Sequence, residues 1–158
     1  MSDDRFQLVS EQAARTQCNI YLQSLRIPIE VYVDEFRTPW VRMTATEDFG
    51  GLSMPARLAY RVLDKTPSAL AVEYTLTQRV TLLVYFDRRA DEYIRTAFDR
   101  LGVGIAGLGT HVMLPVEPGN YPFRWARNRH PEASARLPYL SEVEGTLRSI
   151  GAIRRRSA

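Results

Sequence analysis

The run from Val80 to Phe86 constrains the fold more than any other stretch of the sequence. It reads VTLLVYF, so apolar side chains stand at both odd and even positions. Successive side chains of a β-strand point to opposite faces of a sheet, and a strand of this composition therefore needs apolar cover on both faces. The run is far shorter than the ~20 residues of a membrane-spanning helix. It predicts the central strand of a sheet covered on both sides.

Stretches in which apolar and polar residues alternate predict further strands around this one. The connections between them are too short for crossover helices, which predicts an antiparallel meander. Phe49-Gly50-Gly51 should interrupt the strand pattern, and Thr38-Pro39 should lie in a turn. The remaining strands are expected over residues 27–34, 40–46, 58–62, 70–76 and 111–116.

The first of three expected helices covers residues 5–25 and ends before Pro28. Asp4 can cap its start, with Gln7 three residues further on. One apolar stripe should face the core, formed by Ala14, Cys18, Leu22 and Leu25. Cys18 lies on this stripe and is therefore interpreted as a small buried apolar residue.

Two more amphipathic helices follow later in the chain. One covers residues 89–101 and ends at Gly102, and the other begins at Ser141, with Glu144 completing a capping box, and ends at Gly151. The fold class predicted from these elements is α+β. A mainly antiparallel sheet is packed by an N-terminal helix, a middle helix and a short C-terminal helix, in a single domain over residues 1–158.

Composition limits the compartment and the partners. The chain has 158 residues and one cysteine, so it cannot form an intrachain disulfide. Its first residues are polar and acidic, which predicts that no signal peptide directs secretion. The net charge of +3 is too small to imply a polyanionic partner, but residues 118–158 carry eight arginines and three glutamates. The basic character is thus concentrated in the last quarter of the chain.

The sequence predicts no catalytic, cofactor-binding or metal-binding residues. GVGIAGLG at 102–109 contains G-x-G-x-x-G, but it follows a helix and leads into β structure, unlike a dinucleotide-binding turn. A flexible loop or a glycine-rich strand in close backbone contact is the preferred interpretation. His111 and His130 are too isolated for a zinc site. Glu47-Asp48 and Asp91-Glu92 are consecutive, so each is interpreted as a pair on the solvated surface.

The segment 118–137 is the most unusual part of the sequence. Pro118, Pro122, Pro131 and Pro138 lie in or beside it, which predicts an extended loop or contact arm. Aromatic residues and arginines alternate there. Both kinds are enriched in protein interfaces, and together they can bind nucleic acid, the rings by stacking on bases and the arginines by contact with phosphates. The third interpretation is that the rings pack back on the core. The candidate interface residues are Tyr121, Phe123, Arg124, Trp125, Arg127 and Arg129.

The strand VTLLVYF and the following helix RRADEYIRTAFDRLG, at residues 80–102, resemble an element of the tail-terminator and neck proteins of tailed bacteriophages. This resemblance covers about a quarter of the chain and is architectural. It implies a small α+β subunit that assembles into a ring at the head–tail junction, and hence a cytoplasmic or virion-associated protein.

These observations favour a non-enzymatic structural subunit of a homo-oligomer that also contacts other assembly proteins. No cofactor and no membrane partner are expected. One alternative is a nucleic-acid-binding domain that uses the basic C-terminal quarter. The other is a small enzyme whose site carries no recognised motif.

Overall fold

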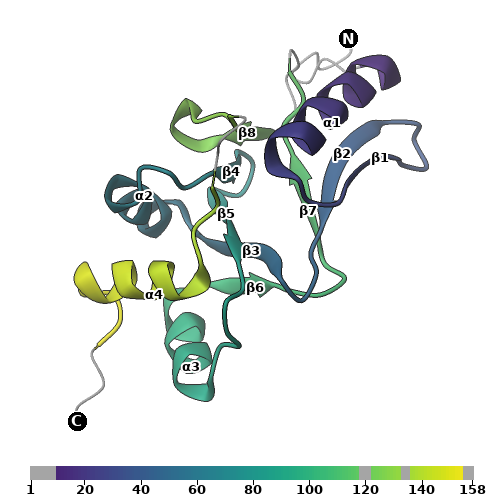
Figure 1. The fold of residues 1–158 in the computed structure, drawn as a ribbon. Coiled ribbons are helices and arrows are strands. Elements are labelled where there is room, and N and C mark those ends of the chain that lie inside the picture. The colour runs from purple at the N-terminus through teal and green to yellow at the C-terminus, as the bar shows by residue number, and fades with distance from the viewer. Residues whose placement is uncertain (1–9, 118–121, 133–135, 155–158) are drawn as a thin grey trace.

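The computed structural model in Figure 1 describes residues 10–117, 122–132 and 136–154. Within these residues the chain forms four α-helices, eight β-strands and one 3-10 helix. In chain order they are α1 (Glu11–Leu25), β1 (Ile29–Val33), β2 (Pro39–Thr44), β3 (Phe49–Pro55), α2 (Ala56–Lys65), β4 (Ala71–Tyr74), β5 (Arg79–Tyr85), α3 (Glu92–Leu101), β6 (Gly104–Ala106), β7 (His111–Leu114), β8 (Phe123–Trp125), η1 (Ala126–Asn128) and α4 (Leu140–Ser149).

The strands form two antiparallel sheets, so the α+β fold class is confirmed. Three strands pair in the order β1-β2-β7, and five pair in the order β6-β3-β5-β4-β8. The predicted simple meander is wrong, because α2 lies between β3 and β4 in the chain, and because the chain passes from β6 in the larger sheet to β7 in the smaller one. Among the described residues, no helix is both long enough and apolar enough to cross a membrane.

Strand β5 is the middle of the five-stranded sheet, as its sequence predicts. Val80, Leu82 and Val84 are fully buried in one apolar cluster together with Ile94 and Phe98 of α3. The intervening side chain of Leu83 is equally buried but belongs to a second cluster on the opposite face. Each face of this strand therefore has its own core.

The helices divide between these two cores. Figure 1 shows α1 beside the three-stranded sheet, while α2, α3 and α4 gather at the other side of the molecule. Ala14, Cys18, Tyr21 and Leu25 form the buried side of α1, and the thiol of Cys18 lies 3.6 Å from the carbonyl oxygen of Ile29. Tyr21 thus takes the buried position expected for Leu22, which is 39% exposed.

Two predicted features between residues 49 and 65 are wrong. Residues 58–62 belong to helix α2, because its buried residues Ala59, Val62 and Leu63 follow helical spacing and the apparent alternation covers only one turn. Residues 49–51 are the first residues of strand β3. A Cβ on Gly50 would lie 2.1 Å from the carbonyl oxygen of Ala106. Glycine is needed here because β6 approaches so closely.

The start of α1 differs from expectation, whereas the end of α3 agrees with it. The cap of α1 is Ser10, whose hydroxyl accepts a hydrogen bond from the Ala13 amide, while Asp4 and Gln7 lie outside the described residues. Gly102 ends α3 in the left-handed conformation, as predicted.

Helix α4 has no capping box. It begins at Leu140, and the carboxylate of Asp87 accepts hydrogen bonds from the amide and hydroxyl of Ser141. Glu144 is fully buried and forms ion pairs with Arg88 and Arg148. A carboxylate from a distant loop thus replaces the expected local one at the positive end of the helix.

Candidate interaction surface

The segment 118–137 is not an extended arm where the structure describes it. Phe123–Trp125 forms strand β8 at the edge of the larger sheet, paired with β4, and Ala126–Asn128 forms η1. Tyr121 lies outside the described residues. The prediction of a loop without secondary structure is wrong for residues 123–128, because an edge strand makes ladder bonds to one neighbour only and tolerates nearby prolines.

The two described aromatic residues of this segment pack against the protein's own core. Trp125 is 4% exposed, and its ring meets that of Tyr21 edge-on at 5.5 Å between centroids. Its indole N–H donates to the Tyr21 hydroxyl at 3.0 Å, and that hydroxyl donates to the carbonyl of Pro115 at 2.7 Å. Burial raises the pKa of the Tyr21 phenol. Phe123 is half-buried and stacks on Tyr74 at 4.9 Å.

The arginines of the segment bind groups of the same chain. Arg124 donates to both carboxylate oxygens of Glu73, at 3.0 and 3.2 Å, and Arg127 forms an ion pair of 2.9 Å with Asp64. Arg129 donates to the carbonyls of Leu63 and Thr66, which lie at the C-terminal end of α2. A guanidinium at this position both caps the helix and matches its negative end.

These ion pairs line a polar hollow of about 580 Å³, formed among others by Tyr60, Glu73, Arg124 and Arg127. The hydrogen bond from Arg124 is the main reason why the pKa of Glu73 lies below its usual value. Burial, followed by the hydrogen bond to Glu73, raises the pKa of the Tyr60 phenol. Because Glu73 and Asp64 offset the two arginines, the hollow has little net positive charge with which to attract phosphate groups.

The sequence analysis placed three residues outside any site: Cys18, His111 and His130. In the structure they contact different groups. Cys18 is buried, and its pKa is raised chiefly by that burial. Nδ1 of His111 lies 3.0 Å from the hydroxyl of Thr44, and Nε2 of His130 lies 3.0 Å from the side-chain oxygen of Asn128. Within the described ranges, no group of three or more histidine, cysteine, aspartate or glutamate side chains is arranged to hold a metal ion.

The turn between β1 and β2 presents an exposed phenylalanine, which the sequence analysis did not single out. Phe36 is 81% exposed, more than any other large apolar side chain in the described part of the chain. The turn that carries it is well defined, because one carboxylate holds three of its groups. Asp34 accepts hydrogen bonds from the amides of Phe36 and Thr38, at 2.9 and 2.8 Å, and from the Trp40 indole at 2.9 Å.

These contacts hold the carboxylate in its charged form. The Trp40 indole, followed by the Thr38 amide, lowers the pKa of Asp34. The aspartate two residues before an exposed phenylalanine was a usable signal for such a turn, since aspartate side chains commonly bond the backbone two residues on. The third hydrogen bond to Asp34, from the Trp40 indole, could be known only from the pairing of β1 with β2.

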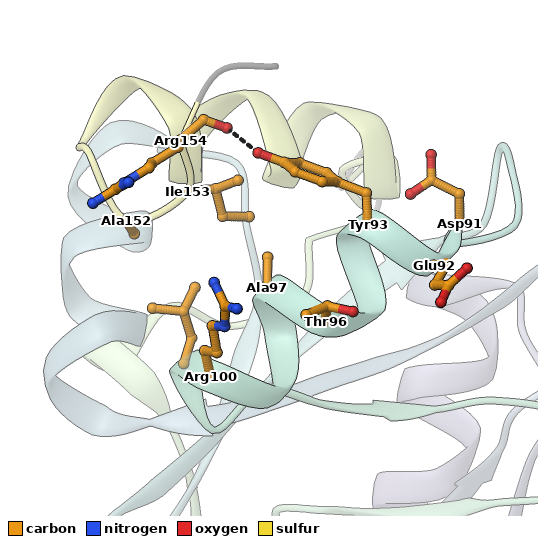
Figure 2. Close-up of a pocket in the computed structure, with 10 residues that line it drawn as sticks. Asp91, Glu92, Tyr93, Thr96, Ala97, Arg100, Ala152, Ile153 and Arg154 are labelled. Atoms are coloured by element: carbon orange, nitrogen blue, oxygen red, sulfur yellow. Dashed lines mark hydrogen bonds between the residues drawn. The ribbon is translucent and has the colours of Figure 1, made fainter. Parts of the chain in front are cut away.

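A groove lies on the opposite side of the molecule, between α3 and the segment that follows α4. It has a volume of about 880 Å³. Ile153 is 3% exposed and anchors this segment, and the hydroxyl of Tyr93 donates to the carbonyl of Arg154 at 2.7 Å. Figure 2 shows Asp91 and Glu92 at one end of the groove.

The fold and these surfaces define a class rather than a family: within the described residues, an α+β protein of two antiparallel sheets, with an exposed phenylalanine on a hydrogen-bonded turn and an open groove beside α3. Comparison with protein-family models, with curated proteins and with solved structures gave no match to this chain.

Proposed function

We propose that this protein is a non-enzymatic structural subunit that self-associates into a homo-oligomer. The observation that supports the proposal is the exposure of Phe36 on a turn fixed by Asp34. Covering a phenylalanine side chain is worth about 1.5–3 kcal/mol, and aromatic residues are enriched in protein interfaces. The exposed Phe36 side chain is unfavourable in water, so a partner surface that covers it lowers the free energy of association.

The stiffness of the turn strengthens this argument. Ordering a mobile loop on binding costs free energy, and a loop already held in one conformation avoids most of that cost. The carboxylate of Asp34 bonds two backbone amides and one indole, so the backbone that carries Phe36 is fixed before any partner arrives. An exposed aromatic ring on a fixed turn is suited to contact with another protein.

The assembly we propose is a ring, and the head–tail junction of a tailed bacteriophage is the setting suggested by the resemblance of residues 80–102 to tail-terminator and neck proteins. The interface proposed here differs from the one that the sequence predicted. Trp125, Phe123 and the nearby arginines stabilise the subunit, and the β1–β2 turn takes over as the contact element.

The proposal is tested by measuring the mass of the full chain in solution. Light scattering after size exclusion, together with sedimentation over a wide range of concentration, should give species that are multiples of the 18.1 kDa chain. A protein that stays at the mass of one chain at every concentration would contradict self-association.

A further inference from the structure

The tip of the β1–β2 turn carries three exposed side chains with a distinctive order. Glu35, Phe36 and Arg37 give one negative charge, one aromatic ring and one positive charge in succession. Arg37 has a φ of 61°, which helps to turn the chain sharply between the two strands. Neither charged side chain forms an ion pair with another residue that the structure describes, so both are available to a partner.

The groove beside α3 carries charges at its two ends and apolar groups between them. Figure 2 shows Arg100 and Arg154 toward one end and Glu92 toward the other, with Ala97 and Ile153 in the middle. In the described part of the chain neither the Arg100 nor the Glu92 side chain has an ion-pair partner. Along its length the groove is therefore positive at the Arg100 end, apolar in the middle and negative at the Glu92 end.

The tip matches this groove in both order and size. Glu92 and Arg100 are eight residues apart on α3, which places them about 12 Å apart along the helix axis. The Cα atoms of Glu35 and Arg37 lie at most about 7 Å apart, and the reach of a glutamate and an arginine side chain can supply the remainder. With Phe36 over Ala97, Glu35 would lie toward Arg100 and Arg37 toward Glu92. Opposite charges at both ends fix the direction of docking.

The turn cannot enter the groove of its own chain. Figure 1 places the β1–β2 turn and α3 far apart, at opposite sides of the molecule. We infer that the tip Glu35–Phe36–Arg37 of one copy docks in the groove between α3 and Ile153 of a second copy. This inference rests on the self-association proposed above and specifies the two surfaces that meet.

Contacts of this kind are head-to-tail. Because the turn and the groove lie on opposite sides of the molecule, two copies cannot dock their tips in each other's grooves at the same time. Each copy therefore uses its turn toward one neighbour and its groove toward another. Head-to-tail interfaces generate rings when the rotation closes. The inference therefore predicts oligomers of more than two copies and no stable two-fold dimer.

The first experiment exchanges the charges at one end of the contact. Glu35→Arg and Arg100→Glu should each weaken association about fivefold or more, and the chain with both changes should recover most of that loss, as expected of a charge pair across an interface. Phe36→Ala should weaken association about 30-fold, as removal of a central anchor does. Leu76→Ala is the matched control, because Leu76 is 61% exposed at a different turn. It should associate like the wild type.

The second experiment identifies which surfaces meet. Glu35→Cys and Arg100→Cys are made in separate chains that also carry Cys18→Ala, so that each chain has one thiol. With a bis-maleimide whose spacer replaces the reach of the two side chains, a covalently linked pair should form when the two variants are mixed. Neither variant alone should cross-link beyond the level of a Glu47→Cys control.

The outcomes separate this inference from the proposed function. Oligomers that form without any cross-link in the mixture, or that survive Phe36→Ala intact, overturn the docking and leave self-association standing. Cross-linking by Glu35→Cys alone shows a symmetric turn-to-turn contact and also overturns it. A wild-type chain that stays monomeric overturns both. Cross-linking only in the mixture, together with the charge rescue, supports the docking of the tip in the groove of a second copy.

Discussion

Replacement of Trp125 should show that β8 belongs to the core of the subunit. Trp125 is 4% exposed, and truncation of a buried tryptophan to alanine costs about 3–5 kcal/mol. We therefore expect Trp125→Ala to lower the free energy of unfolding by that amount. Arg127→Ala, two residues further on, removes a 45% exposed side chain whose ion pair with Asp64 is itself exposed, and should cost less than about 1 kcal/mol.

The hydrogen bond between Trp125 and Tyr21 allows a sharper test. Trp125→Phe keeps an aromatic ring but removes the indole donor, and should cost about 1–3 kcal/mol. Tyr21→Phe leaves both the indole N–H and the Pro115 carbonyl without their partner, and should cost about 2–4 kcal/mol. In the chain with both changes the indole no longer exists, so the combined loss should be about 1 kcal/mol smaller than the sum.

The assay is equilibrium unfolding in urea, followed by far-ultraviolet circular dichroism so that the loss of a tryptophan does not alter the signal. Strictly additive losses would show that the indole–phenol bond contributes nothing. A loss below about 1 kcal/mol for Trp125→Ala would show that the segment around residue 125 packs on the subunit only weakly. This second result would reopen the interpretation of this segment as a contact arm.

Three further changes test other parts of the structure. Phe98→Ala, at a position that is 1% exposed against β5, should cost about 3–5 kcal/mol in urea unfolding, and a cost below about 1 kcal/mol would mean that α3 is wrongly placed. Glu73 has a lowered pKa, so its contribution to stability is present above the ordinary value of 4.5 and is lost as pH falls below it. The stability of Glu73→Gln should therefore decline less on acidification than that of the wild type, and an equal decline would show that the contact with Arg124 contributes nothing. Gly50→Ala should reduce the yield of folded protein or cost more than about 3 kcal/mol, because its Cβ would meet the Ala106 carbonyl, and a normal melting temperature would contradict that contact.

The sequence was sufficient for elements whose environment can be inferred from the chain itself. The run of residues 80–86 could only be a strand with cover on both faces, and Gly102 marked the end of α3 correctly. Helix α2 was misread because Leu58, Tyr60 and Val62 fit a strand pattern over five residues, too short a span to separate the two periods.

The candidate site was harder to predict because distant residues decide its exposure. Trp125 is buried by Tyr21, which stands 104 positions earlier, and no local pattern connects them. Arg124 and Arg129 looked like groups offered to a partner until the structure placed Glu73 and the end of α2 beside them. The exposure of Phe36 likewise follows from the register of β1 and β2.

Strand β5 has a consequence for how the protein melts. Its adjacent residues Leu82 and Leu83 are both fully buried, yet they belong to different apolar clusters. The backbone between these two residues thus belongs to both cores. Loss of packing in one core should therefore displace β5 and disturb the other core. Calorimetry should record a single transition whose measured enthalpy equals the van't Hoff enthalpy. A cavity made beside Met43 in one cluster should accordingly lower the melting temperature reported by a probe beside Phe98 in the other.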